Sequence, residues 1–203
     1  MNGRKAAALQ LDSGDVSSFD AFVSRLVDVL NEKWNRDQFD ILVNNAGFGF
    51  HASIAETTEE QFDSLMNVQF KGVFFLSQKL FSRIADNGRV VNISTGLTRF
   101  VIEGFGAYSA MKGAIEILTK YMAKEWGKRG IRVNSVAPGA IATDFGGGAV
   151  RDNREMRDFI GSNTALGRVG EADDIGGVVA SLCTDEMGWV NAIRLEASGG
   201  QLL

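Results

Sequence analysis

A tyrosine and a lysine four positions apart, Tyr108 and Lys112 in the segment AYSAMKG, are the strongest candidates for chemistry in this 203-residue chain. On a helix, this spacing places both side chains on one face. A free phenol has a pKa of about 10, and a nearby ammonium group lowers that pKa by favouring the phenolate. The pair therefore suits proton transfer to or from a carbonyl or carbinol oxygen, although such pairs also occur by chance in helices.

Two hydroxyl groups follow an apolar run that lies before this pair. Ser94 and Thr95 come directly after GRVVNI, and Thr95 lies thirteen positions before Tyr108. Successive residues of a strand point to opposite faces of the sheet, so only one of the two hydroxyls can face the Tyr108 side. We expect Thr95 to face it and Ser94 to be structural.

The elements that must position these residues alternate between strands and helices. Short segments rich in apolar residues and bounded by turn residues predict strands at 6–11, 39–43, 88–93, 131–137 and 192–196. Helical periodicity and capping signals predict helices at about 17–34, 57–84, 108–128, 152–160 and 173–183, the second bent near Asn67. This alternation predicts a doubly wound parallel α/β sheet in a single domain, residues 1–203, with ligands bound at the carboxyl ends of the strands.

Taken together, the motifs of the chain are similar to those of the classical short-chain dehydrogenase/reductase family, from about Ala6 to the last residue. The matching segments are DILVNNAG, MNVQFKGVFF, GRVVNIST, AYSAMKGAIEILTKYMAKEWGKRGIRVNSVAPGAIATD, LGRVGEADDI and the terminal ASGG. The resemblance implies a Rossmann-like NAD(P)-dependent oxidoreductase that interconverts a carbonyl and a secondary alcohol. The 3-oxoacyl-carrier-protein reductases look most similar, and the sequence does not specify the substrate.

The resemblance implies four catalytic residues. Tyr108 would be the general acid in reduction and the base in oxidation, and Lys112 would depress its pKa and bind the nicotinamide ribose. Asn67 would hold a water in a proton relay from Lys112 to solvent. Thr95 takes the place of the family's usual serine. Its hydroxyl can still donate to the substrate oxygen, while its methyl group stiffens the side chain and crowds the site.

The resemblance also implies a line of contacts to the cofactor, which would be NADP or NAD, with a slight preference for NADP. Small residues would let the cofactor ribose approach the backbone, and Asp12 with Ser13 would lie near the adenine ring. The cofactor-binding residues implied are Asp12, Ser13, Asn45, Ala46, Gly47, Tyr108, Lys112, Pro138, Gly139, Ile141 and Thr143.

One part of the family pattern is not found in the sequence. The family opens with a strand, a glycine-rich turn, a helix and a second strand, and this chain begins at what would be the third strand. Two glycine-rich segments lack the strand-turn-helix context of a phosphate-binding turn: 47–49, interpreted as a substrate-side loop, and 146–148, interpreted as a flexible lid. We therefore expect a domain without its first strand-helix-strand unit, and weak dinucleotide binding. The segment 6–11 would be detached, re-paired or paired with another chain.

Two functions stay open at this point. The first is an active oxidoreductase, and the second is a catalytically silent remnant that self-associates or binds partners. The predicted helices after Val68 and after Tyr108 resemble those of the family's dimer interface, which favours a homodimer or homotetramer. The face concerned mixes small and apolar residues: Gly113, Ala114, Ile117, Leu118 and Tyr121. The alternative is that this face belongs to the intrachain core.

Composition excludes several other classes of function. The net charge is −4 with scattered charges, whereas nucleic acid or an anionic membrane requires clustered basic residues. Cys183 is the only cysteine, so no intrachain disulfide is possible, and a lone thiol suits a reducing, cytoplasmic compartment. No apolar run is long enough to span a membrane. His51, the only histidine, lacks the ligand cluster of a metal site.

Overall fold

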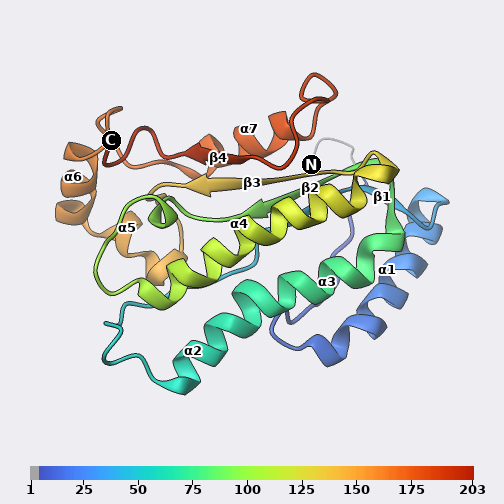
Figure 1. Ribbon diagram of the computed structural model, residues 1–203, viewed down its shortest axis with the longest axis horizontal. Helices are drawn as coiled ribbons and strands as arrows, with labels where there is room; N and C mark the ends of the chain where they lie inside the picture. Colours follow the sequence, from blue (N-terminus) through green and yellow to red (C-terminus); the bar gives the residue numbers. More distant parts are fainter. Residues whose placement is uncertain (1–4) are drawn as a thin grey trace.

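The structure is a computed structural model that describes residues 5–203, with a four-stranded parallel sheet at its centre. The strands lie side by side in chain order: β1 (Phe39–Asn44), β2 (Ile84–Ile93), β3 (Arg132–Pro138) and β4 (Arg194–Ala197). Helices cover both faces (Figure 1). This arrangement confirms the predicted doubly wound α/β architecture.

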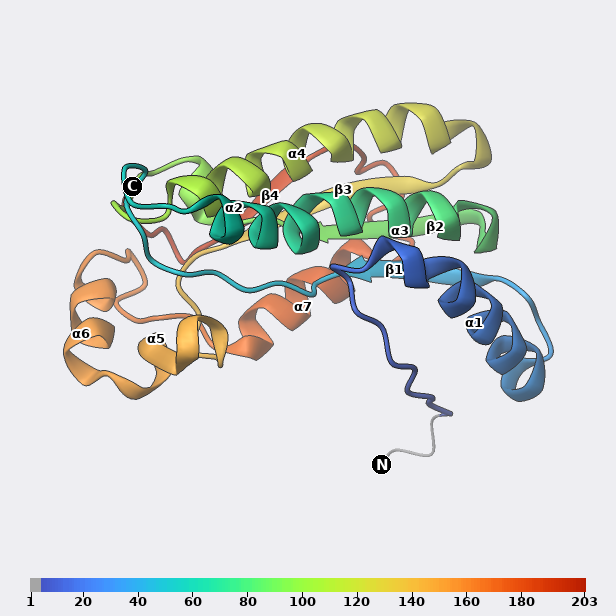
Figure 2. The same ribbon diagram turned by 90° about the horizontal axis from the view of Figure 1, so that it is seen from below.

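A layer of helices that includes the two longest packs against one face of the sheet. This layer contains α1 (Phe19–Trp34), α2 (Glu59–Met66), α3 (Val73–Leu80) and α4 (Gly106–Trp126), as Figures 1 and 2 show. The opposite face carries α7 (Ala172–Leu182), whereas the short helices α5 (Ala149–Asp152) and α6 (Arg154–Ser162) lie beyond the carboxyl ends of the strands (Figure 1). No helix of residues 5–203 is long and apolar enough to cross a membrane.

The core lies on both sides of β3, which is the most deeply buried strand. Val133 and Val90 face α4 and pack with Met122, whereas Val136 packs with Leu182 of α7 on the other face. Three polar residues of β3 are also buried, and each donates to a backbone carbonyl of the segment before β4: Arg132 to Met187, Asn134 to Val190 and Ser135 to Ile193.

The segment between α2 and α3 departs from regular α-helical geometry. A π-helix, Asn67–Gly72, joins the two helices where the sequence predicts a bend. Gly72 is required there because a Cβ atom would lie 1.9 Å from the carbonyl oxygen of Ser13. Single turns of π-helix are often found at functional sites.

The predicted strand at 6–11 is wrong: this segment is extended but belongs to no strand, and it lies outside the sheet (Figure 2). Its carbonyl groups are bonded to side chains of α1, with Lys33 Nζ 2.9 Å from the Ala6 oxygen and Arg25 Nη2 3.3 Å from the Gln10 oxygen. Because α1 holds the segment, it does not pair with β1. Of the three arrangements predicted for it, detachment from the sheet is the one observed.

Candidate active site

Tyr108 and Lys112 occupy the first two turns of α4, where the helix crosses the carboxyl end of β2. Both are buried, at 7% and 5% exposed. Lys112 Nζ donates to the carbonyl oxygen of Ile93, the last residue of β2, at 2.8 Å, and lies 5.8 Å from the centroid of the Tyr108 ring. The helical spacing and the end of β2 thus bring the two groups together.

Thr95 completes this cluster from the loop after β2. Its hydroxyl accepts the Leu97 amide at 3.3 Å, and its side chain lies close enough to the Tyr108 phenol to act on the pKa of that group. The neighbouring Ser94 instead donates to Glu116 Oε1 at 2.6 Å. The two hydroxyls therefore point to different sides of the loop, as the alternation of strand residues predicts.

Burial sets the protonation states of the pair. It raises the pKa of Tyr108 to about 12, while the hydrogen bond from Thr95 acts in the lowering direction. Burial also lowers the pKa of Lys112 to about 8. The expected depression of the tyrosine pKa by Lys112 is not seen in this structure, where burial of the phenol is the largest cause of the shift. At neutral pH Tyr108 is a protonated phenol, which is the form required of a proton donor in carbonyl reduction.

The fourth predicted catalytic residue lies at the start of the π-helix. Asn67 is half-buried and is its first residue, whereas Gln69, two positions later, is fully buried. Gln69 Nε2 donates to the carbonyl of Phe48, and its Oε1 is buried without a partner in the described part of the chain. Sequence reasoning missed Gln69, although an amide between two apolar residues of a helical segment was a visible indication.

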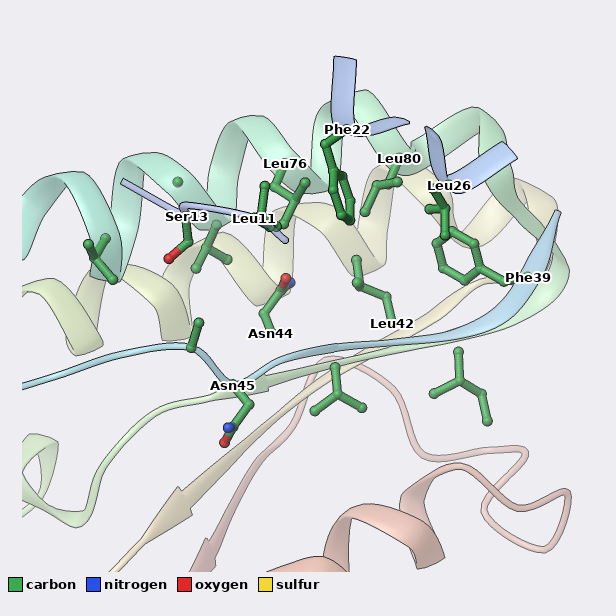
Figure 3. Close-up of a pocket in the computed structure, with 16 residues that line it drawn as sticks. Leu11, Ser13, Phe22, Leu26, Phe39, Leu42, Asn44, Asn45, Leu76 and Leu80 are labelled. Atoms are coloured by element: carbon green, nitrogen blue, oxygen red, sulfur yellow. The ribbon is translucent and has the colours of Figure 1, made fainter. Parts of the chain in front are cut away.

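Three predicted cofactor residues line one pocket, of about 350 Å³, between β1, α1 and α3. Figure 3 shows Ser13 and Asn45 near one end of it, and mainly aliphatic and aromatic side chains along the rest; Ala46 is the third of these residues. Gly47 follows these residues and has no room for a side chain, since a Cβ atom would lie 2.8 Å from Gln69 Oε1. Asp12 is exposed and caps the following turn, accepting the Gly14 amide at 2.8 Å.

The remaining predicted cofactor residues form the loop after β3. Pro138 ends the strand, and the Gly139 amide donates to the Ala197 carbonyl at 3.1 Å. Ile141 forms a bridge with Gly170, and Thr143 Oγ1 accepts the Phe145 amide at 3.3 Å. Since β1 and β3 are separated by β2, the predicted cofactor residues lie along the carboxyl edge of the sheet on both sides of Tyr108.

An aromatic side chain covers Tyr108 from the segment interpreted as a lid. The Phe145 ring lies 5.6 Å from the Tyr108 ring, and Gly49 approaches it so closely that a Cβ atom would be 2.6 Å from Phe145 Cζ. The three glycines that follow, 146–148, all have left-handed φ values of 61°, 72° and 81°. His51 lies near this site, with its ring edge-on to Phe105 at 5.5 Å. The surroundings of the phenol are thus largely aromatic.

The sequence of this chain is similar to that of known oxidoreductases. The model of the enoyl-(acyl carrier protein) reductase family matches residues 4–201. The chain is 35% identical to an uncharacterized oxidoreductase of Methylorubrum extorquens, over 98% of this chain and 77% of the relative. It is 39% identical to an NADPH-dependent aldehyde reductase-like chloroplastic protein of Arabidopsis thaliana, over 79% of this chain and 60% of the relative.

Solved structures show the same relationship. The promiscuous reductase LugOII, which catalyses keto-reduction at C1 in lugdunomycin biosynthesis, superposes with a TM-score of 0.91 at 39% identity, covering 99% of this chain and 79% of LugOII. The angucycline C-6 ketoreductase LanV with bound NADP gives a TM-score of 0.86 at 35% identity, over 93% and 72% of the two chains. This chain therefore belongs to the short-chain dehydrogenase/reductase family of NAD(P)-dependent oxidoreductases.

Proposed function

We propose that this chain reduces a ketone or aldehyde to the alcohol with NADPH, and catalyses the reverse oxidation with NADP. The observation that supports this most is the buried cluster in which Thr95 lies beside the Tyr108 phenol, with Lys112 one helical turn away. NADP is favoured over NAD because LanV was solved with NADP and the Arabidopsis thaliana relative is named as NADPH-dependent.

The residues of the chain divide the chemistry among them. The cofactor, when bound, supplies or accepts the hydride. Tyr108 donates its phenolic proton to the carbonyl oxygen, and the Thr95 hydroxyl donates a hydrogen bond to that oxygen as negative charge develops on it. The Lys112 ammonium and the Tyr108 hydroxyl are suited to the ribose hydroxyls of the cofactor. Asn67 as part of a proton relay stays a prediction.

The cofactor fits along the carboxyl edge of the sheet. Ala46 and Gly47 expose backbone there, so a ribose can approach closely, and Ser13 with Asn45 contributes polar groups to the pocket beside β1. The same proposal places the nicotinamide and phosphates against the loop after β3, which includes Pro138, Gly139, Ile141 and Thr143. Asp12 would lie near the adenine ring.

The aromatic surroundings of Tyr108 favour an apolar, ring-containing ketone as the substrate. Phe145 and Phe105 offer ring faces and edges, and sugars would leave their hydroxyl groups without partners on such a surface. A 3-oxoacyl thioester, the substrate class of the reductase branch that the sequence resembles, is the second candidate. The relatives are all named as reductases, dehydrogenases or oxidoreductases, so a catalytically silent module is the less favoured alternative.

A titration followed by a turnover assay tests the proposal. NADPH and NADH are titrated by cofactor fluorescence, and oxidation of each is then followed with a polycyclic aromatic ketone, a 3-oxoacyl thioester and a ketosugar. We expect NADPH to bind more tightly than NADH, although weakly because no glycine-rich phosphate-binding turn is found in the sequence, and the aromatic ketone to turn over fastest. Failure of both cofactors to bind or react would favour the silent module, and the Tyr108→Phe variant shows whether any observed turnover comes from this site.

We further propose that the chain forms a homodimer or homotetramer through the outer face of α3 and α4. Ile117 and Tyr121 are 54% and 65% exposed on α4, and Phe74 of α3 is also exposed. Leu118, by contrast, packs into the intrachain core, so only part of the predicted face is free. Light scattering at micromolar concentration tests this proposal, and the Ile117→Lys/Tyr121→Glu variant should be monomeric if it is correct.

A further inference from the structure

We propose that Glu116 and Arg194 are positioning residues that hold the Thr95 loop against α4 and so aim the Thr95 hydroxyl at Tyr108. This inference rests on the proposed function only for its kinetic consequence. The geometry that carries it involves three elements: α4, the loop after β2, and β4.

Glu116 lies one helical turn after Lys112 on α4, and one of its oxygens gathers three donors. Glu116 Oε1 accepts Ser94 Oγ at 2.6 Å, Thr98 Oγ1 at 2.7 Å and Arg194 Nε at 2.8 Å. Ser94 and Thr98 flank Thr95 in the sequence. The carboxylate therefore fixes the loop on both sides of the predicted catalytic hydroxyl.

Arg194 begins β4 and reaches the same loop from the other side. In addition to Glu116, its Nη2 donates to the Thr95 carbonyl oxygen at 3.2 Å, and its Nη1 donates to Glu196 Oε2 at 3.0 Å. One guanidinium thus links α4, β4 and the backbone of Thr95. Such planar, multidentate binding is specific to arginine, because lysine offers a point charge on a flexible stem.

A second ion pair supports Arg194. Glu196 accepts Arg99 through both of its oxygens, at 2.6 and 2.7 Å, and Ser198 Oγ at 2.6 Å, and these donors lower its pKa to about 2. Arg99 also donates to the carbonyl oxygens of Gln201 and Leu202. The end of β4 and the residues after it are therefore tied to the Thr95 loop.

Arg194 and Glu116 are partly buried, so their interaction differs from that of an exposed surface ion pair. The side chains of Arg194 and Glu116 are only 23% and 16% exposed, so their interaction is screened less than that of an exposed pair. Glu116 and Arg194 contact this loop through Ser94, Thr98 and the Thr95 carbonyl oxygen, and none of these contacts uses the Thr95 hydroxyl. The network therefore fixes the loop while leaving the hydroxyl free for Tyr108 and a substrate oxygen.

A spectroscopic test reads the orientation of Thr95 without any turnover. Tyr108 and Tyr121 are the only tyrosines, so a Tyr121→Phe background leaves Tyr108 as the single isotope-labelled tyrosine. The Cζ chemical shift of its ring reports the hydrogen bond to the phenol. It is measured at neutral pH for Thr95→Val, Glu116→Leu, Arg194→Met and the conservative Glu116→Gln.

We expect Glu116→Leu and Arg194→Met to move the Tyr108 resonance in the same direction as Thr95→Val. The chemical shift in Glu116→Gln should lie between those of these variants and that of the parent protein. Adding Thr95→Val to Glu116→Leu should produce no further shift, because both remove the same hydrogen bond. The matched control is Asp40→Asn, which breaks the doubly bonded Arg36–Asp40 pair at the opposite end of β1 and should leave the resonance unchanged.

The kinetic arm uses the substrate on which the parent protein is most active. Glu116→Leu should lower kcat by about tenfold or more, as expected for a displaced hydrogen-bond donor, with little change in the KM for NADPH. A Tyr108 resonance that moves with Thr95→Val but stays fixed in Glu116→Leu and Arg194→Met overturns the inference. Inactivity of the parent protein would count against the proposed function alone, because the spectroscopic result does not depend on it. A variant that fails to fold is replaced by Arg194→Lys, whose shorter reach should give the same displacement.

Discussion

The region around β3 and the edge of the sheet formed by β1, here called the two sides of the sheet, differ in how completely side chains are buried and polar groups are paired. Around β3 and α4, apolar side chains are buried on both faces, and charged groups such as Glu116 and Arg194 have several partners. Around β1, the pocket beside α1 is lined with apolar side chains, and Ile41 is 44% exposed, whereas Ile84 in the neighbouring β2 is fully buried. Among residues 5–203, no strand pairs with the other edge of β1.

This difference separates the two tasks of the candidate site. The predicted catalytic groups lie on the side that is fixed by burial and hydrogen bonds, so their geometry is defined by this chain. The predicted contacts to the adenosine end of the cofactor, Ser13 and Asn45, lie on the open side. An apolar edge of this kind gains stability from a ligand or a further segment that covers it. If the two sides differ as the structure indicates, substitutions around β3 and α4 should have larger effects than substitutions around β1.

The largest effect is expected from Tyr108→Phe. Removal of the proton donor should lower kcat by about a thousandfold, within the range for loss of a general acid. The melting temperature should change little, because the ring and its contact with Phe145 remain. Steady-state kinetics and thermal unfolding, measured on the same preparation, check this expectation. Normal turnover in this variant would show that the chemistry takes place elsewhere.

The buried lysine should make stability depend on pH. The pKa of Lys112 is lowered to about 8 in the folded state, from an ordinary value of 10.5. Below pH 8, the group is protonated in both states, and the cost of burying its charge is fully present. Between pH 8 and 10.5, the unfolded chain holds more protons, so stability rises with pH, by about 3 kcal/mol in total.

Urea unfolding across this pH range measures the effect, and Lys112→Met is the variant that removes it. In the variant, the free energy of unfolding should no longer rise between pH 8 and 10.5, whereas the contributions of the other titrating groups should be unchanged. A parent protein whose stability is flat over this window would mean that Lys112 reaches solvent in the folded state.

A matched pair of isoleucines compares the two sides of the sheet directly. Ile84→Ala, in a fully buried position of β2, should lower the free energy of unfolding by about 3 kcal/mol. Ile41→Ala in β1 should cost about 1 kcal/mol or less, because its side chain is 44% exposed. Equal losses in urea unfolding would indicate that β1 is covered in solution, for example by a second copy of the chain.

Of these four predictions, the removal of the Thr95 hydroxyl is expected to have the smallest effect. Thr95→Val should lower kcat by about a hundredfold, as for the loss of one donor to a developing oxyanion. Thr95→Ser keeps the hydroxyl and frees χ1, so its kcat should equal or exceed that of the parent. The comparison is made with the same substrate at saturating NADPH, and a fully active Thr95→Val would assign the donor role to another group.

Periodicity and spacing were sufficient for the catalytic half of the fold. The segment 131–137, ended by Pro138 and Gly139, predicted β3. The four-residue spacing predicted that Tyr108 and Lys112 share a helix face, and strand alternation separated Thr95 from Ser94. Each of these inferences depends only on local geometry. The predicted strand at 6–11 failed because a strand also needs a neighbour, and α1 binds this segment instead.

The sequence by itself determined the family, the parallel α/β architecture and the residues around Tyr108, since these follow from short-range patterns that any such fold repeats. Tertiary structure alone decided the protonation states, because burial and not the nearby ammonium governs the pKa of Tyr108. It also placed Phe145 over the phenol and joined Glu116 to Arg194, which are 78 positions apart. Contacts over such distances in the chain depend on how the layers pack, and no local pattern encodes that packing.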